Sequence, residues 1–486
     1  MMPSLPRRPA DHGPPASATL GELLASGWLS RSVKEELRAN LLTRLGEGGD
    51  VFPGVVGYGE TVLPAVENAI LAGQDLVFLG ERGQAKTRMA RLLVGLLDDW
   101  LPIVRGGELN DDPTAPISPA ARALVAERGD DTPIEWLPRD RRYAEKLATP
   151  DITIADLIGE VDPVRVAEGR YLSDELTLHY GLIPRANRGI FAINELPDLA
   201  ERIQVGLLNI LEERDVQIRG FVVRLPLDLF VVASANPEDY TSRGRIITPL
   251  KDRLGSQIRT HYPRTLEHEI AIVRQEKQRF DAQPGVPPVV VPTFMEELVA
   301  ELTHLARRSP EISQRSGVSV RVSVANTEVL EAAALKRAVR LGEPVGAPRV
   351  SDLGAVMAST AGKVELESIG DESPEERVVE RLVARAVHAT FSRLVDVDDL
   401  DEVVVAFEEG LVVEAGERVS SREYVRWMRE VPGLENAVRR LGAFDVTDGA
   451  EEPAVVASAV EFLLEGLHLV RRVNKDRAGS GVRYAR

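Results

Sequence analysis

The strongest constraint on the fold of this chain lies between residues 75 and 97. A short apolar run from Asp75 to Leu79 has the length and composition of a buried strand, and a glycine-containing loop follows it. Beyond the loop, apolar residues recur at the spacing of one helical face: Met89, Leu92, Leu93, Leu96 and Leu97. The order strand, loop, helix is the setting in which a phosphate-binding loop occurs.

The loop itself matches the pattern G-x-x-x-x-G-K-[ST] at all but one position. We therefore expect nucleotide contacts from its residues: Gly80, Glu81, Arg82, Gly83, Gln84, Ala85, Lys86, Thr87 and Arg88. Main-chain N–H groups would wrap the β-phosphate, Lys86 would reach the β- and γ-phosphates, and the Thr87 hydroxyl would coordinate Mg²⁺. The alternative is a Gly-rich turn that matches by chance.

The departure is Ala85, which stands where the pattern has its second glycine. Alanine carries a Cβ and tolerates a positive φ poorly. If the loop needs a positive φ there, nucleotide affinity falls. If residue 85 is helical, the substitution costs little.

A second buried strand is expected over Gly189 to Asn194, with Glu195 after it. Polar residues at the carboxyl end of such a strand face the ligand edge of a parallel sheet. Glu195 would orient or deprotonate the attacking water, and Asn194 would contact a Mg²⁺-bound water without contributing charge. A helix start capped by Asn194 is the competing interpretation.

A third apolar strand, Leu229 to Ala233, and a helical pattern over Ile203 to Leu211 complete the alternation. This predicts an α/β fold, a parallel sheet covered by helices on both faces. After about residue 263 the pattern is helical. We expect a disordered N-terminus (1–18), a helical segment (19–50), the α/β nucleotide-binding domain (51–262), a helical lid (263–365), a helical C-terminal region (366–475) and a tail (476–486).

Composition narrows the function further. The net charge of −17 disfavours general nucleic-acid binding. A basic run, Arg139, Arg141, Arg142 and Lys146, is expected to be a solvated loop. The chain has no cysteine, no secretory signal and no apolar run of membrane-spanning length, so we expect a cytoplasmic protein without membrane insertion.

The order of motifs resembles the AAA+ ATPases of the magnesium-chelatase ATPase-subunit and MoxR type, over residues 50 to about 340. Residues 52–57, Phe-Pro-Gly-Val-Val-Gly, resemble the segment that opens the family's nucleotide-binding domain. The most specific similarity is the stretch with Gly159-Glu160-Val161-Asp162, Gly169 and residues 181–189, Gly-Leu-Ile-Pro-Arg-Ala-Asn-Arg-Gly, which runs into the second strand.

The resemblance implies roles for three further residues. Asn236 looks like sensor 1, with a turn residue before proline as the alternative, and Arg253 is similar to an arginine finger, with a surface ion pair as the alternative. Arg321 resembles sensor 2, and Arg315 is a rival. The family likeness also implies a homo-oligomeric ring, a hexamer, and a partner with a von Willebrand A domain.

These expectations combine into one leading hypothesis. The protein would bind and hydrolyse ATP with Mg²⁺ and use the energy to remodel a partner protein. The alternative is a regulatory or scaffold module that binds nucleotide with weak or no hydrolysis, which Asn194 motivates.

Overall fold

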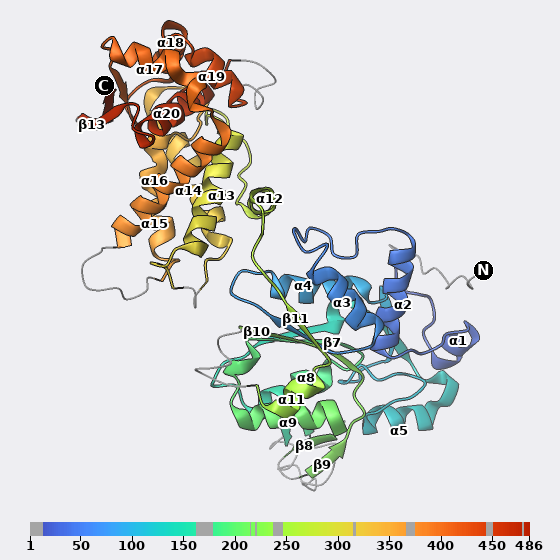
Figure 1. Cartoon of the computed structure of the whole chain (residues 1–486). Helices are drawn as coiled ribbons and strands as arrows, with labels where there is room; N and C mark the ends of the chain where they lie inside the picture. Colours follow the sequence, from blue (N-terminus) through green and yellow to red (C-terminus); the bar gives the residue numbers. More distant parts are fainter. Residues whose placement is uncertain are drawn as a thin grey trace. The chain divides into compact units, whose positions relative to one another are not determined.

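The computed structural model describes residues 13–161, 178–213, 215–218, 221–236, 246–313, 317–365, 375–443, 451–478 and 481–486. Residues 1–12, the part of the chelatase-like stretch from Asp162 to 177, and Arg315 lie outside this description. The chain forms two compact units that divide between His261 and Tyr262. Each unit is described separately (Figure 1).

The first unit is built on a five-stranded parallel sheet in the order β11-β1-β10-β7-β4. Its strands span β1 (Leu76–Leu79), β4 (Tyr143–Leu147), β7 (Gly189–Asn194), β10 (Leu229–Ala235) and β11 (Ser256–Arg259). All neighbours run parallel, so their carboxyl ends meet at one edge of the sheet. The three strands expected from the apolar runs are β1, β7 and β10, and they are adjacent in the centre.

Helices cover both faces of this sheet, as Figure 1 shows. On one face, side chains such as Phe78 and Phe230 pack in a core with helices α2 (Val33–Gly46), α3 (Val62–Leu71) and α4 (Lys86–Leu92). On the other face, alternate residues such as Val77 and Val231 pack in a second core. It includes residues of helices α8 (Leu182–Arg185), α9 (Glu201–Glu213) and α11 (Thr248–Arg253). The α/β fold with a parallel sheet is thus confirmed.

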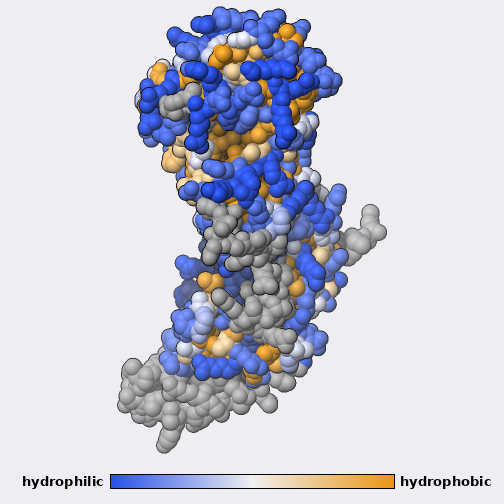
Figure 2. Space-filling view, turned by 60° about the vertical axis from the view of Figure 1, so that its left-hand side comes forward, coloured by the Kyte–Doolittle hydropathy of each residue, from blue (hydrophilic) through white to orange (hydrophobic). Residues whose placement is uncertain are grey.

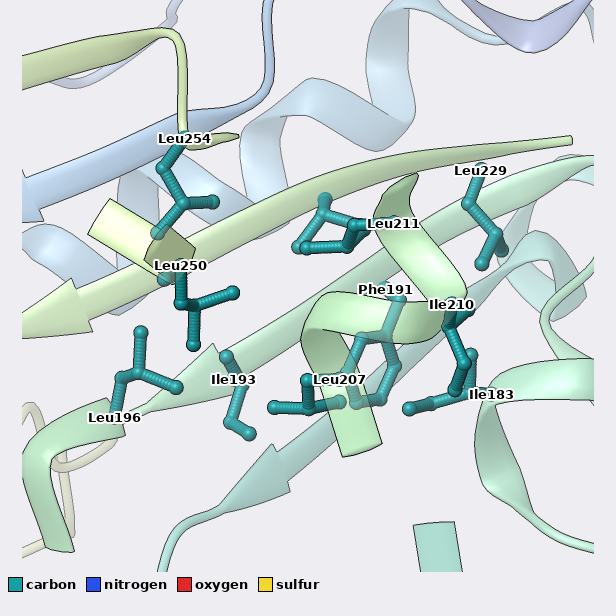
Figure 3. Close-up of a pocket in the computed structure, with 12 residues that line it drawn as sticks. Ile183, Phe191, Ile193, Leu196, Leu207, Ile210, Leu211, Leu229, Leu250 and Leu254 are labelled. Carbon is teal, nitrogen blue, oxygen red and sulfur yellow. The ribbon is translucent and has the colours of Figure 1, made fainter. Parts of the chain in front are cut away.

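A small cavity of about 20 Å³ lies between the second face and helices α9 and α11 (Figure 3). Twelve apolar side chains line it: Ile183, Phe191, Ile193, Leu196, Leu207, Ile210, Leu211, Leu229, Val231, Ala233, Leu250 and Leu254. Because a buried water needs polar partners, a cavity lined this way stays dry. Helices α9 and α11 therefore rest on the sheet through apolar packing.

The smaller elements of the first unit lie around the sheet. The helices are α1 (Leu20–Ala25), α5 (Pro119–Arg128) and α6 (Ile154–Leu157). Three antiparallel strand pairs are β2 (Trp100–Val104) with β3 (Ile134–Pro138), β5 (Gly159–Val161) with β6 (Leu178–Tyr180), and β8 (Asp215–Ile218) with β9 (Phe221–Arg224). The 3₁₀ turns lie at 93–96, 129–131, 139–142 and 196–198.

Two expectations about the first unit are corrected. The expected disorder of residues 1–18 does not extend to its end, because Ser17 and Ala18 accept hydrogen bonds from Trp136 Nε1 and the Ile134 N–H, both at 2.9 Å. The basic run is not a solvated loop at Arg142. That side chain is buried and forms a two-pronged ion pair with Glu36 of α2, at 2.7 and 2.6 Å. The helical segment 19–50 is thereby fixed to the first unit.

The second unit is mainly helical. Its helices are α12 (Leu266–Glu276), α13 (Thr293–Arg308), α14 (Arg321–Leu341), α15 (Val356–Ala361), α16 (Glu375–Leu394), α17 (Asp401–Glu408), α18 (Ser421–Glu430), α19 (Leu434–Arg440) and α20 (Pro453–Leu469), with 3₁₀ turns at 350–355 and 397–400. One core runs from Phe294 to Tyr484, and α20 is buried along nearly its whole length. The expected lid and C-terminal region thus share a single core.

The end of the chain also differs from expectation. Strands β12 (Val413–Ala415), β13 (Asn474–Ala478) and β14 (Gly481–Ala485) form an antiparallel sheet in the order β12-β14-β13. Residues 476–486 are therefore part of a hairpin, and the expected tail is wrong. The buried Tyr484 anchors this hairpin by donating a hydrogen bond to Glu465 of α20, at 2.5 Å.

Within the described ranges, no helix combines the length and the apolar character that crossing a membrane requires. Hydrophilic side chains dominate the face drawn in Figure 2, and smaller apolar patches lie among them. This agrees with the acidic composition of the chain.

Candidate nucleotide-binding site

The loop after β1 adopts the backbone that the glycine pattern implies. Gly83 has a φ of 77°, and Ala85 has a φ of 57° and a ψ of 17°, in the left-handed region. Helix α4 begins at Lys86 immediately after it. Residue 85 thus needs a positive φ, and alanine raises the energy of this conformation by about 1 kcal/mol relative to glycine.

Two buried contacts hold the loop in this shape. The Oε1 atom of Gln84 accepts a hydrogen bond from the Glu81 N–H at 3.1 Å and from Thr260 Oγ1 at 2.6 Å. Gly80 passes so close to these groups that a Cβ would lie 1.8 Å from Thr260 Oγ1. Gly80 therefore cannot be replaced without displacing the Thr260 and Gln84 side chains. Across the described residues, the N–H groups of Gly83, Gln84 and Ala85 have no hydrogen-bond partner, so they can receive a phosphate.

Tyr58 adds a support that the sequence patterns did not identify. Its hydroxyl lies 2.9 Å from the Gln84 carbonyl oxygen and 2.8 Å from the His261 carbonyl oxygen. The Tyr58 and His261 rings pack edge to face, and burial raises the pKa of Tyr58 to about 12. A buried neutral tyrosine thus ties the segment before α3 to the loop. Only the folded chain brings these residues together, 26 and 203 positions apart.

Lys86 lies inside the loop. Its side chain is buried, and Nζ donates to the carbonyl oxygens of Gly80, Glu81 and Ala235. Nζ is also 3.2 Å from Oδ1 of Asn236, the residue that follows β10. The residues that resemble the phosphate-binding lysine and sensor 1 are therefore adjacent.

Asn194, at the carboxyl end of β7, lies beside the start of α4. Its Oδ1 accepts hydrogen bonds of 3.3 Å from Thr87 Oγ1 and from Ser234 Oγ. Its Nδ2 donates to Glu145 Oε1 at 2.7 Å. These bonds hold Asn194 in place across three strands and the loop. A 3₁₀ turn does begin after Glu195, but its cap position is Glu195, and Asn194 bonds across the strand ends instead.

Glu145 lies on β4 and has no counterpart among the expected site residues. It accepts two hydrogen bonds from Arg91, from Nε at 2.8 Å and from Nη2 at 3.1 Å, and one from the Tyr143 hydroxyl at 3.0 Å. The Arg91 hydrogen bond is the main reason that the pKa of Glu145 lies below its usual value. A carboxylate is therefore charged at neutral pH next to Asn194.

Glu195 follows Asn194 in a left-handed conformation, with a φ of 55° and a ψ of 49°. Its N–H donates to Ser234 Oγ at 3.2 Å. The side chain is half-buried, and the described part of the chain offers its carboxylate no hydrogen-bond partner. A strained backbone at a half-buried, unpaired carboxylate is a feature of functional positions.

The two expected arginines lie on helices rather than on these strand ends or the loop. Arg253 is the exposed last residue of α11 in the first unit. Arg321 is the exposed first residue of α14 in the second unit. Their roles as finger and sensor 2 stay predictions.

The donor set fits a nucleotide-bound Mg²⁺ better than a resident metal. Oxygen atoms of Thr87, Asn194 and Glu145 gather here, and oxygen is the ligand that Mg²⁺ prefers. In the ranges that the structure describes, no group of three or more His, Cys, Asp or Glu side chains could hold a metal ion. Mg²⁺ usually takes few protein ligands and completes its shell with water and phosphate.

The sheet and the loop define an α/β fold of the P-loop type. The motif order and the sheet together make the chain similar to the AAA+ ATPases, as the sequence predicts. No protein-family model matches the sequence.

Several solved structures are similar to this chain. A predicted ATPase from Cytophaga hutchinsonii is 16% identical, with a TM-score of 0.31 over 74% of this chain and 97% of that one. A model of the BchI and BchD subunits of magnesium chelatase is 20% identical, with a TM-score of 0.34 over 68% and 98%. NtrX from Brucella abortus with ATP is 13% identical, with a TM-score of 0.38 over 85% and 71%. At these values the function must be inferred from the site.

Proposed function

We propose that this protein binds ATP with Mg²⁺ and hydrolyses it, and that it works as a ring that remodels a partner protein. The observation that carries the proposal is the cluster at the carboxyl edge of the sheet. There Lys86 lies 3.2 Å from Asn236, and Thr87 lies 3.3 Å from Asn194. Unpaired loop amides lie next to them.

The residues divide the chemistry among them. The amides of residues 83–85 and the ammonium group of Lys86 hold the phosphates. Thr87 and Asn194 would hold Mg²⁺, and the cation would neutralise phosphate charge. Glu195 orients the attacking water and accepts its proton, and Asn236 positions the terminal phosphate beside Lys86. Each of these groups is fixed by a strand end or by the loop.

The proposed role of Arg253 requires an oligomer. An arginine finger acts on the nucleotide of a neighbouring subunit, so it lies outside its own subunit's cluster. The exposed position at the end of α11 is compatible with that role. We propose a hexameric ring with a von Willebrand A partner on the family resemblance, and a cytoplasmic location on the composition.

A second candidate function is nucleotide binding without useful hydrolysis. Two observations favour it: Asn194 contributes no charge where an acid is usual, and Ala85 occupies a strained conformation. Both lower the expected turnover more than they affect the fold.

Two variants separate these functions. Lys86→Ala should weaken ATP binding about 10- to 100-fold, because each hydrogen bond to a charged group contributes about 1.5–3 kcal/mol. Glu195→Gln should leave ATP binding unchanged and slow phosphate release at least about 100-fold, because it removes the base. Binding is measured with a fluorescent nucleotide and turnover by phosphate release, with the exposed Lys336→Ala as control.

Equal phosphate release by the wild type and Glu195→Gln would favour the binding module. If Lys86→Ala binds ATP as tightly as the wild type does, the loop is not the binding site and both functions fail.

A further inference from the structure

Asn194 places an uncharged amide at the proposed Mg²⁺ site. A bound Mg²⁺ beside Thr87 would face an amide oxygen rather than a carboxylate at the end of β7. An amide oxygen coordinates the cation or its water but does not neutralise it. The phosphates of the nucleotide supply most of the negative charge, and a carboxylate near the amide would add to it.

Glu145 is the carboxylate next to this amide. Strand β4 pairs in parallel with β7, so Glu145 sits opposite Ala192, and its Oε1 reaches Asn194 Nδ2 at 2.7 Å. A carboxylate can only accept hydrogen bonds, so it engages the amide nitrogen of Asn194. The Oδ1 atom of Asn194 is then directed to Thr87 and Ser234, both at 3.3 Å.

We propose that Glu145 is the acidic member of the Mg²⁺ site, a positioning residue that orients Asn194 and places its charge beside the cation that accompanies the nucleotide. This inference rests on the proposed function. The acid that usually ends the second strand has, in effect, been replaced by one from the neighbouring strand.

Arg91 controls how much negative charge Glu145 adds to the site. Its guanidinium neutralises Glu145 through two hydrogen bonds, yet 64% of the Arg91 side chain is exposed. An exposed ion pair contributes little to stability, so the arginine can turn into water at small cost. The Arg91 contact thus offsets the negative charge that Glu145 adds near the cation. Removing the Glu145 carboxylate should therefore weaken cation binding, and removing the Arg91 guanidinium should strengthen it.

The experiment measures how strongly the cation and the nucleotide depend on each other. The dissociation constant of a fluorescent ATP analogue is determined in EDTA and in excess Mn²⁺. The value in EDTA divided by the value in Mn²⁺ gives the coupling between cation and nucleotide. We expect Glu145→Gln to lower this ratio about tenfold, since affinity depends on the charge around the cation, while binding in EDTA does not weaken. Arg91→Gln should raise the ratio about threefold, because the carboxylate is released.

Two further variants complete the design. Glu145→Gln combined with Asn194→Asp should restore the wild-type ratio, because the charge returns to the end of β7. Glu127→Gln, an exposed charge change on α5, should leave both constants unchanged.

The outcomes distinguish this inference from the function on which it rests. A wild-type ratio in Glu145→Gln, or an unchanged ratio in Arg91→Gln, would overturn the role of Glu145. If the wild type shows no saturable nucleotide binding in either condition, the proposed function itself is wrong. The Arg91 variant lies on the surface, so its result does not depend on how Glu145→Gln folds.

Discussion

Arg349 in the second unit and Lys86 in the first are both buried cations, but their surroundings differ. The Arg349 guanidinium donates to the Val419 carbonyl oxygen at 2.8 Å and to Ser421 Oγ at 2.7 Å, and it packs 4.8 Å from the centre of the Tyr424 ring. Around Lys86, the bonds to Glu81, Ala235 and Asn236 are 3.2–3.4 Å long.

The difference separates a structural network from a binding site. Around Arg349 most polar groups bond to other protein groups: Glu461 is also buried and accepts from the Ser351 N–H and the Tyr424 hydroxyl, while Arg349 Nε has no hydrogen-bond partner among the described residues. At the edge of the first sheet, Lys86 also makes a short bond to the Gly80 carbonyl oxygen, but the unpaired loop amides and the half-buried Glu195 leave capacity for a ligand. Buried polar groups that bond to one another stabilise a fold, whereas polar groups without protein partners can bind a ligand.

The largest effect is expected from breaking the buried network around Arg349. Arg349→Met would leave the buried Glu461 without its nearby positive charge, and removing one partner of a buried pair costs about 3–5 kcal/mol. Hydrogen exchange of peptides from residues 262–486 would measure the loss. Arg426→Met removes an exposed pair with Glu430 on α18 and should cost no more than about 0.5 kcal/mol. Equal protection in both variants would contradict the distinction.

A second prediction concerns pH. Glu269 is fully buried in the second unit and accepts from Arg307 at 2.8 and 3.0 Å and from Ser323 at 2.6 Å. Burial raises the pKa of this carboxyl, but the hydrogen bonds and the nearby His304 outweigh burial, so the pKa lies below its usual value. The stabilisation is therefore fully present above about pH 4.5 and is lost as the pH falls through the lowered pKa.

Glu269→Gln tests this sign directly. The variant should be less stable than the wild type by about 1.5–3 kcal/mol at pH 7, since it loses hydrogen bonds to a charged acceptor. The difference should shrink as the pH falls below 4.5, which denaturant unfolding at a series of pH values would follow. A difference that grows towards acid pH would contradict the lowered pKa.

The central fold was predictable because its strands are buried on both faces. Strands β1, β7 and β10 are runs of apolar residues, and their pattern needs no knowledge of distant contacts. Strand β4, with the sequence YAEKL, lies at the sheet edge, and β13, with NKDRA, is polar. Their pairing depends on long-range partners, so periodicity does not reveal them.

The residues of the candidate site also fall into two groups, those that the sequence identifies and those that it does not. Lys86, Thr87, Asn194 and Asn236 were identifiable because each follows or ends a recognisable strand or loop. Glu145 and Tyr58 were not, because their contacts with Asn194 and Gln84 depend on strand register and on packing between segments far apart in the chain. Arg142 shows the same limit, since its burial depends on Glu36, 106 residues away.

The smallest expected effect is at Ala85, and it sharpens the contrast between the loop and an ordinary helix. Ala85→Gly should stabilise the first unit by up to about 1 kcal/mol, because glycine adopts a φ of 57° without strain. Nucleotide affinity should stay within about twofold, because the loop holds this conformation without nucleotide and the strain is then the same in the free and the bound state. The same change at Ala123, exposed in the middle of α5, should destabilise the unit by about 0.5–1 kcal/mol.

Thermal unfolding and nucleotide titration of both variants test the sign of the stability change. Destabilisation by both would mean that residue 85 is not held in the left-handed conformation, and the loop would then bind phosphate with a different backbone.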